Sequence, residues 1–137
     1  MPVIRRLLET ALYCDDLGRT ASFYRRFFPA ATLVEGERLV ALDAGGKTVL
    51  LLFQQGKSRE ALPTPGGVVP GHEGHGPVHV AFAIDSNDLP AWELQLEAWG
   101  VVIESRVQWP AGGLSLYFRD PDGRSVELVT PGTWATY

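Results

Sequence analysis

The stretch LSLYFRDPDGRSVELVT, residues 114–130, decides the fold. Apolar and polar residues alternate over 114–119 and again over 125–130, which is the pattern of strands with one buried face. Between these runs, Asp120-Pro121-Asp122-Gly123 places proline and glycine where a tight turn requires them. The stretch therefore predicts an antiparallel hairpin of two half-buried strands.

The residues before this hairpin predict a strand, a helix and a further strand. Residues 79–85 alternate as a strand, and residues 101–107 form a second strand-like run. Between them Asp88 is a candidate N-cap, Pro90 falls in the first helical turn and Gly100 ends the pattern. The apolar stripe of this helix consists of Leu89, Trp92, Leu96 and Trp99. The order of elements is therefore βαβββ.

The first half of the chain repeats this order. A strand is expected at 7–14 and a helix at 17–28, capped by Asp15 or Asp16 and stopped by Pro29. Strands are expected at 32–35, 38–43 and 47–53. The sequence thus predicts a single α+β domain over 1–137, built from two βαβββ modules at about 4–56 and 78–131. The modules are expected to form an incomplete barrel-like sheet with the helices outside.

A segment rich in glycine and proline, residues 57–77, connects the two halves. A loop of that length without structure is either a linker or a functional lid, and the sequence favours neither. Its histidines, His72 and His75, allow a metal ligand or a general base, or a loose His-rich cluster with His79.

Composition limits the partners. The net charge is −4 and the basic residues are scattered, which argues against nucleic acid. The longest apolar run, 49–53, is too short for a bilayer, and no export signal is recognisable. A cytoplasmic protein with a small-molecule partner is therefore expected. The lone Cys14 excludes an intramolecular disulfide and is expected to be a buried apolar residue.

One face of the second module is predicted to carry the functional groups. Strand alternation places His79, Ser115, Tyr117, Arg119 and Glu127 opposite the face that the helix covers. A carboxylate in the apolar setting of Glu127 is costly unless it is paired or bound to a metal. Substrate contacts are expected from Ser115, Tyr117 and Arg119, although Arg119 has turn carboxylates as alternative partners.

Alignment of the two halves pairs Glu9 with His79 and Leu50 with Glu127. The first module is therefore expected to contribute one carboxylate, Glu9, and an apolar wall that includes Leu50 and Leu52. Plain structural roles are the alternatives: a salt-bridged carboxylate for Glu9 or Glu127, and a hydrogen-bonded core histidine for His79.

The chain resembles the vicinal oxygen chelate superfamily, which includes glyoxalase I, fosfomycin-resistance enzymes, bleomycin-resistance proteins and extradiol dioxygenases. The likeness covers nearly the whole chain. It is carried by the stretches LYCDDL (12–17), SFY (22–24), GPVHVAF (76–82), SLYFRDPDG (115–123) and VEL (126–128).

The resemblance implies one divalent ion (Mn, Ni, Zn or Fe) held by Glu9, His79 and Glu127, with Leu50 at the fourth ligand position. It implies Lewis-acid activation of a small substrate with vicinal oxygens, with Glu127 and His72 as catalytic candidates. It also implies a homodimer. The competing expectation is a binding protein that sequesters a small molecule in the same cleft without turnover.

Overall fold

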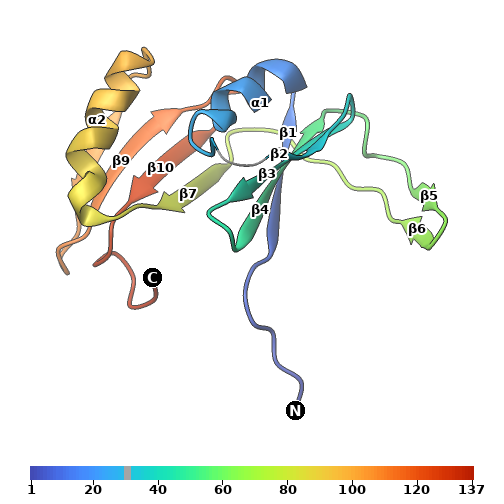
Figure 1. Ribbon diagram of the computed structural model, residues 1–137, viewed down its shortest axis with the longest axis horizontal. Coiled ribbons are helices and arrows are strands. Elements are labelled where there is room, and N and C mark those ends of the chain that lie inside the picture. Colours follow the sequence, from blue (N-terminus) through green and yellow to red (C-terminus); the bar gives the residue numbers. More distant parts are fainter. Residues whose placement is uncertain (30–31) are drawn as a thin grey trace. The chain divides into compact units, whose positions relative to one another are not determined.

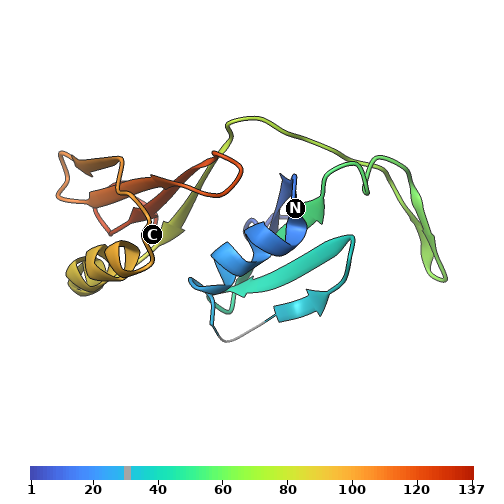
Figure 2. The ribbon, with the colours of Figure 1, turned by 90° about the horizontal axis from the view of Figure 1, so that it is seen from above.

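The computed structural model describes residues 1–29 and 32–137, which divide into two compact units at 1–75 and 76–137. Each unit contains one βαβββ module (Figures 1 and 2), so the predicted α+β class and the two modules are confirmed. No helix in the described parts of the chain is long and apolar enough to cross a bilayer.

The first module contains β1 (Glu9–Cys14), α1 (Leu17–Arg25), β2 (Thr32–Glu35), β3 (Leu39–Ala44) and β4 (Thr48–Gln54). Its sheet has the order β1-β4-β3-β2, with β1 parallel to β4 and the other pairs antiparallel. Asp16 caps α1 by accepting a hydrogen bond from the backbone N–H of Arg19 at 3.0 Å. The helix ends at Arg25, three residues before the position expected from its apolar spacing.

One face of this first sheet packs on α1. The register pairs Leu12 with Leu52 and Leu42 with Leu50, so these side chains share one face, and all four are buried. Helix residues Leu17, Ala21 and Tyr24 complete this core.

The second module contains β7 (His79–Ala83), η1 (Ser86–Asp88), α2 (Leu89–Ala98), β8 (Ser105–Gln108), β9 (Leu114–Arg119) and β10 (Ser125–Val129). Its sheet repeats the first topology in the order β7-β10-β9-β8. The core face carries Phe118, Val126 and Leu128, together with Leu96 of α2.

Two local expectations for the second module are corrected. Asp88 makes no side-chain cap, because a short 3₁₀ turn precedes α2 and gives Asp88 helical dihedrals. The strand expected at 101–107 covers only Ser105–Gln108, because residues 101–104 follow the helix as irregular chain.

The connecting segment has more structure than the sequence indicated. It contains a small hairpin of β5 (Leu62–Thr64) and β6 (Gly67–Val69). Beyond the hairpin the chain returns to the first module, where the His72 N–H donates to the Ser58 carbonyl at 2.8 Å and the Ser58 hydroxyl donates to the His72 carbonyl at 2.8 Å. Gly71 permits this approach, since a Cβ there would lie 2.0 Å from the Arg59 carbonyl oxygen.

A buried ion network fixes the β9–β10 turn. The Arg124 guanidinium lies 3.0 Å from Asp122 and 3.4 Å from Asp120, and the three side chains are at most 8% exposed. Asp120 also accepts the backbone N–H groups of Asp122 and Arg124. Removal of the arginine would leave two carboxylates buried without their cation.

We predict that Arg124→Met lowers the free energy of unfolding by about 3–5 kcal/mol, the usual cost of breaking a buried ion pair from one side. The matched control is Arg119→Met in the same hairpin. Its pair with Glu104 is half-exposed and screened by water, so its loss should lower the free energy of unfolding far less. Urea denaturation of both variants checks this, and equal losses would contradict it.

Candidate functional site

The open face of the second sheet gathers the predicted site residues. The register places His79 beside Ser125, Glu127 beside Ala81 and Tyr117, and Ser115 beside Val129. Directly paired residues share a face, so His79, Ser115, Tyr117, Arg119 and Glu127 all point away from α2. The predicted arrangement of this face is confirmed.

His79 and Glu127 are in direct contact. His79 Nε2 lies 3.1 Å from Glu127 Oε2, with the carboxylate side chain 8% exposed and the imidazole 48% exposed. The histidine therefore forms the open side of the pair, and the carboxylate lies deeper in the sheet.

The tautomer of His79 is set by the other ring nitrogen. Nδ1 lies 3.0 Å from the Ser125 carbonyl oxygen, which can only accept, so Nδ1 carries a hydrogen. In the neutral ring, the Nε2 lone pair then faces a carboxylate oxygen of Glu127. The lone pair of Nε2 and that of the carboxylate oxygen repel each other at this distance, unless a proton or a metal cation lies between the two atoms.

A chain of hydrogen bonds supports Glu127 from behind. The Trp109 indole N–H donates to Ser115 Oγ at 2.8 Å, and the Ser115 hydroxyl donates to Glu127 Oε1. Because the indole can only donate, the Ser115 proton is directed to the carboxylate. Ser115 is buried at 1% exposure, and its hydroxyl positions Glu127. The substrate contact expected of Ser115 stays a prediction. No sequence motif indicated this polar role of Trp109.

Tyr117 borders the pair. Its ring lies 6.1 Å from the His79 ring at an interplanar angle of 28°. Burial raises the pKa of the Tyr117 phenol, and a hydrogen bond to Glu127 and the charge of that carboxylate raise it further. Tyr117 is therefore a neutral hydrogen-bond donor at physiological pH.

Arg119 is held at the rim by a residue that the sequence did not indicate. Its guanidinium binds Glu104 at 2.7 and 3.0 Å, and it donates to the Gly123 carbonyl at 3.2 Å. The hydrogen bond from Arg119 to Glu104 keeps the pKa of the Glu104 carboxyl below its ordinary value. The turn carboxylates, which were the alternative partners of Arg119, bind Arg124 instead.

The expected alignment of Leu50 with Glu127 is wrong by one residue. Glu9 pairs with Val49, as His79 pairs with Ser125, so Leu51 corresponds to Glu127. Leu50 points toward α1 and is 2% exposed, and Leu52 points the same way. The open face of the first sheet is instead formed by Val49, Leu51 and Phe53 of β4 and by Glu9, Ala11 and Tyr13 of β1.

His72 belongs to the first unit and lies against this open face. The Tyr13 hydroxyl and His72 Nδ1 are 2.6 Å apart, and the Phe53 ring meets the imidazole edge-on at 4.7 Å. Burial, followed by the charge of Glu73, raises the pKa of the Tyr13 phenol. His75 is exposed at the end of the unit, and its role stays a prediction.

The described residues hold no group of three or more His, Cys, Asp or Glu side chains close enough to bind one ion. Two of the three expected ligands, His79 and Glu127, meet in the second unit, and Glu9 is an exposed residue of the first. The three-ligand centre therefore stays a proposal.

We predict that Glu127→Gln lowers the pKa of Tyr117, because the charge and the carboxylate acceptor are lost. The value should stay above the ordinary one, since burial is the largest cause of the shift. NMR titration of ζ-¹³C tyrosine measures this. Tyr137 is the internal control, since burial and Asp85 raise its pKa, and it should not respond. An unchanged Tyr117 would contradict the contact.

Comparison with known proteins identifies relatives over almost the whole chain. The model of the glyoxalase/bleomycin resistance protein/dioxygenase superfamily matches residues 6–128. The chain is similar to the metallothiol transferase FosB of Bacillus licheniformis, with 34% identity over 85% of this chain and 69% of that protein. It is similarly related to FosB of Shouchella clausii, with 32% identity over 88% of this chain and 76% of that protein.

A solved structure gives the same result. The lactoylglutathione lyase of Agrobacterium tumefaciens superposes with a TM-score of 0.84 and 33% identity, covering 95% of this chain and 96% of that chain. The modules, the strand order and these matches agree, and this chain belongs to the glyoxalase/bleomycin resistance protein/dioxygenase superfamily.

Proposed function

We propose that this protein is a metal-dependent enzyme that acts on a small substrate with vicinal oxygens, with one divalent cation held by His79, Glu127 and Glu9. The observation that carries the proposal is the approach of His79 Nε2 to Glu127 Oε2 at 3.1 Å, while the other ring nitrogen of His79 faces the Ser125 carbonyl.

The donor set fits a divalent cation. Two ligands bound at about 2.0–2.2 Å to one ion, roughly at right angles, lie about 3 Å apart. Both side chains also have the outer contacts typical of metal ligands: the second nitrogen of His79 donates to a carbonyl, and Ser115 donates to Glu127. Glu9 enters as the third ligand from the family resemblance, and the set would suit Mn, Ni, Zn or Fe.

The names of the relatives favour a transferase or lyase over a dioxygenase. Metallothiol transferase and lactoylglutathione lyase both name thiol chemistry, and the first also names a metal. The proposed ligands include one histidine, whereas ferrous oxygenases use two histidines and a carboxylate. We therefore place this protein with the enzymes that join or release a thiol at a small oxygenated carbon centre.

The protein groups have separate roles in the proposed reaction. The bound metal would supply Lewis-acid polarisation of the substrate oxygens. Tyr117, neutral and beside His79, would exchange its hydrogen bond to Glu127 for one donated to a substrate oxygen, and Arg119 would contact an anionic group at the rim. Ser115 and Trp109 hold Glu127 in its orientation. His72 stays a candidate general base, oriented by Tyr13.

A binding protein without turnover is the second candidate. The open face of the first sheet is apolar and aromatic, with Leu51, Phe53 and Tyr13 in place of the predicted Leu50 wall. Such a surface would hold a drug-like molecule by burial alone.

We predict that protein purified without chelator or affinity tag contains close to one divalent metal ion per chain by elemental analysis. His79→Ala and Glu127→Gln should abolish stoichiometric binding, and Glu9→Gln should weaken it. Ser115→Ala should lower the affinity by about 10–100-fold, the usual effect of removing an outer contact. Glu104→Gln, which changes a rim carboxylate, is the control. Failure of each candidate metal to bind the wild type would overturn the proposal.

Turnover separates the two candidates. The metal-loaded protein would be assayed with a thiol plus an epoxide, with a thiol plus a 2-oxoaldehyde, and with a catechol and oxygen. Metal-dependent consumption that is lost in Glu127→Gln supports the enzyme. Tight ligand binding that is indifferent to metal supports the binding protein.

We also propose a homodimer, as the family resemblance implies. Light scattering at micromolar concentration should give twice the mass of the 15.0 kDa chain. A monomer under these conditions would refute the dimer and leave the metal site untouched.

A further inference from the structure

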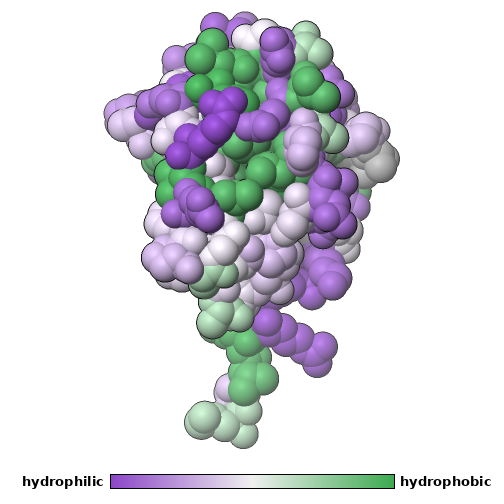
Figure 3. Space-filling model, turned by 90° about the vertical axis from the view of Figure 1, so that its left-hand side faces the viewer, coloured by the Kyte–Doolittle hydropathy of each residue, from purple (hydrophilic) through white to green (hydrophobic). Residues whose placement is uncertain are grey.

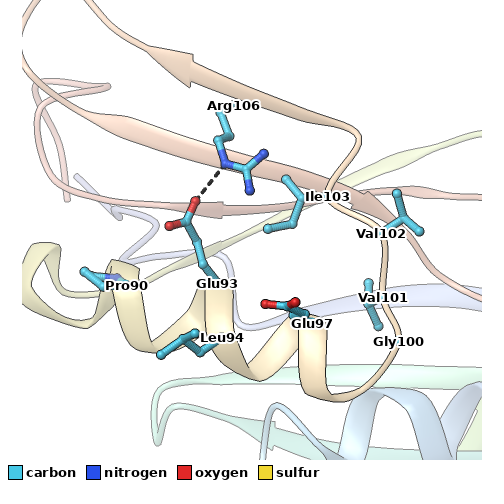
Figure 4. Close-up of a pocket in the computed structure, with 9 residues that line it drawn as sticks. All are labelled: Pro90, Glu93, Leu94, Glu97, Gly100, Val101, Val102, Ile103 and Arg106. Carbon is cyan, nitrogen blue, oxygen red and sulfur yellow. Dashed lines mark hydrogen bonds and ion pairs between the residues drawn. The ribbon is translucent and has the colours of Figure 1, made fainter.

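A groove lies on the outer side of the second module, between α2 and the chain that follows it (Figure 4). Its volume is about 780 Å³, which is within the range of small-molecule sites. Val102 and Leu94 line it with exposed fractions of 80% and 68%, and Ile103 extends the apolar surface. Figure 3 views this side of the molecule and shows hydrophobic surface interleaved with hydrophilic side chains.

The groove is on the opposite face of the sheet from His79 and Glu127. Arg106 pairs with Leu116 in the β8–β9 register, on the core face that α2 covers. The residues of the candidate metal site have the other orientation. A ligand in the groove therefore does not contact the metal site.

Charge in the groove is unbalanced. Glu93 and Glu97 lie one turn apart on the same side of α2, and Arg106 binds Glu93 at 2.7 Å (Figure 4). The Glu97 carboxylate forms no ion pair or hydrogen bond with any described residue. One arginine against two carboxylates leaves a net negative charge beside an apolar surface.

The Glu93–Arg106 pair also divides the available space. A second hollow of about 260 Å³ lies on its other side. It is lined in part by Leu89, Leu114 and Leu116, and it reaches Ser115, whose hydroxyl donates to Glu127. Both hollows are bordered by Glu93 and Arg106. The Arg106 side chain is 61% exposed and the Glu93 side chain is 37% exposed. Little free energy is therefore needed to separate the two.

We propose that this groove is a binding site for a small organic cation, with its apolar body on Leu94, Val102 and Ile103 and its ammonium group on Glu97. The Glu93–Arg106 pair closes the inner end of the site. Opening of this pair admits a longer apolar chain into the second hollow and releases Glu93 as a second carboxylate.

The probe is 4-phenylbutylamine, with 4-phenylbutyrate as the matched anion of the same apolar body. Titration into ¹⁵N-labelled protein should shift the amide signals of α2 and of residues 100–106, and saturate. The amine should bind more tightly than the carboxylate by up to about fivefold, the upper end of the effect of one exposed charge pair. Equal affinities, or shifts at His79 and Glu127 without any in α2 and residues 100–106, would overturn the proposal.

Two variants should change the affinity in opposite directions. Glu97→Gln should weaken the amine about fivefold and leave the neutral analogue 4-phenylbutanol unchanged. Arg106→Gln should strengthen the amine by a similar factor, because Glu93 becomes available. Glu60→Gln, which changes an exposed carboxylate of the connecting segment, is the control. An affinity for the amine that is unchanged in both groove variants would overturn the site, whatever the outcome of the metal analysis.

Discussion

The register of β10 between β7 and β9 is the constraint on which the second module depends. It places Val126 and Leu128 against α2 and Glu127 on the open face, beside Ala81 and Tyr117. Because side chains alternate along a strand, a slip of one residue would bury the carboxylate in the apolar core and expose two core residues. The core and the site are therefore fixed by the same hydrogen-bond ladder.

The Glu127 carboxylate is nearly buried, and its burial is tolerated because each of its two oxygens has a hydrogen-bond partner. Ser115, itself oriented by Trp109, donates to one oxygen, and His79 approaches the other. This series of hydrogen bonds runs from the Trp109 indole to the His79 imidazole. Within the described residues, no buried side-chain N or O atom lacks a hydrogen-bond partner. A fixed carboxylate beside a half-exposed histidine can bind a cation with little rearrangement, which is the property that metal centres require.

The two modules share one topology but differ in chemistry. Where the second has Glu127 and Ser125, the first has Leu51 and Val49, so its open face is largely apolar. The first module adds aromatic residues instead, with Tyr13 and Phe53 around His72. The part of the connecting segment that carries His72 is held in place by two hydrogen bonds between His72 and Ser58. Repetition of the fold therefore produced one polar face suited to a cation and one apolar face.

The sequence by itself determined the order of elements in the two βαβββ modules and the open face of the second module. Helix spacing and strand alternation are local properties, and in β9 and β10 polar residues alternate with apolar ones, so His79, Tyr117 and Glu127 were placed on one face correctly.

Only the tertiary structure decided the register of β4 and the partners of the charged groups. Residues 49–53 are uniformly apolar, so they carry no alternation, and the error at Leu50 follows from that. The pairing of Arg119 with Glu104 and of Arg124 with Asp120 and Asp122 depends on which side of the hairpin each guanidinium reaches. The role of Ser115 depends on Trp109, which lies beyond a turn, and no local spacing specifies contacts of that kind.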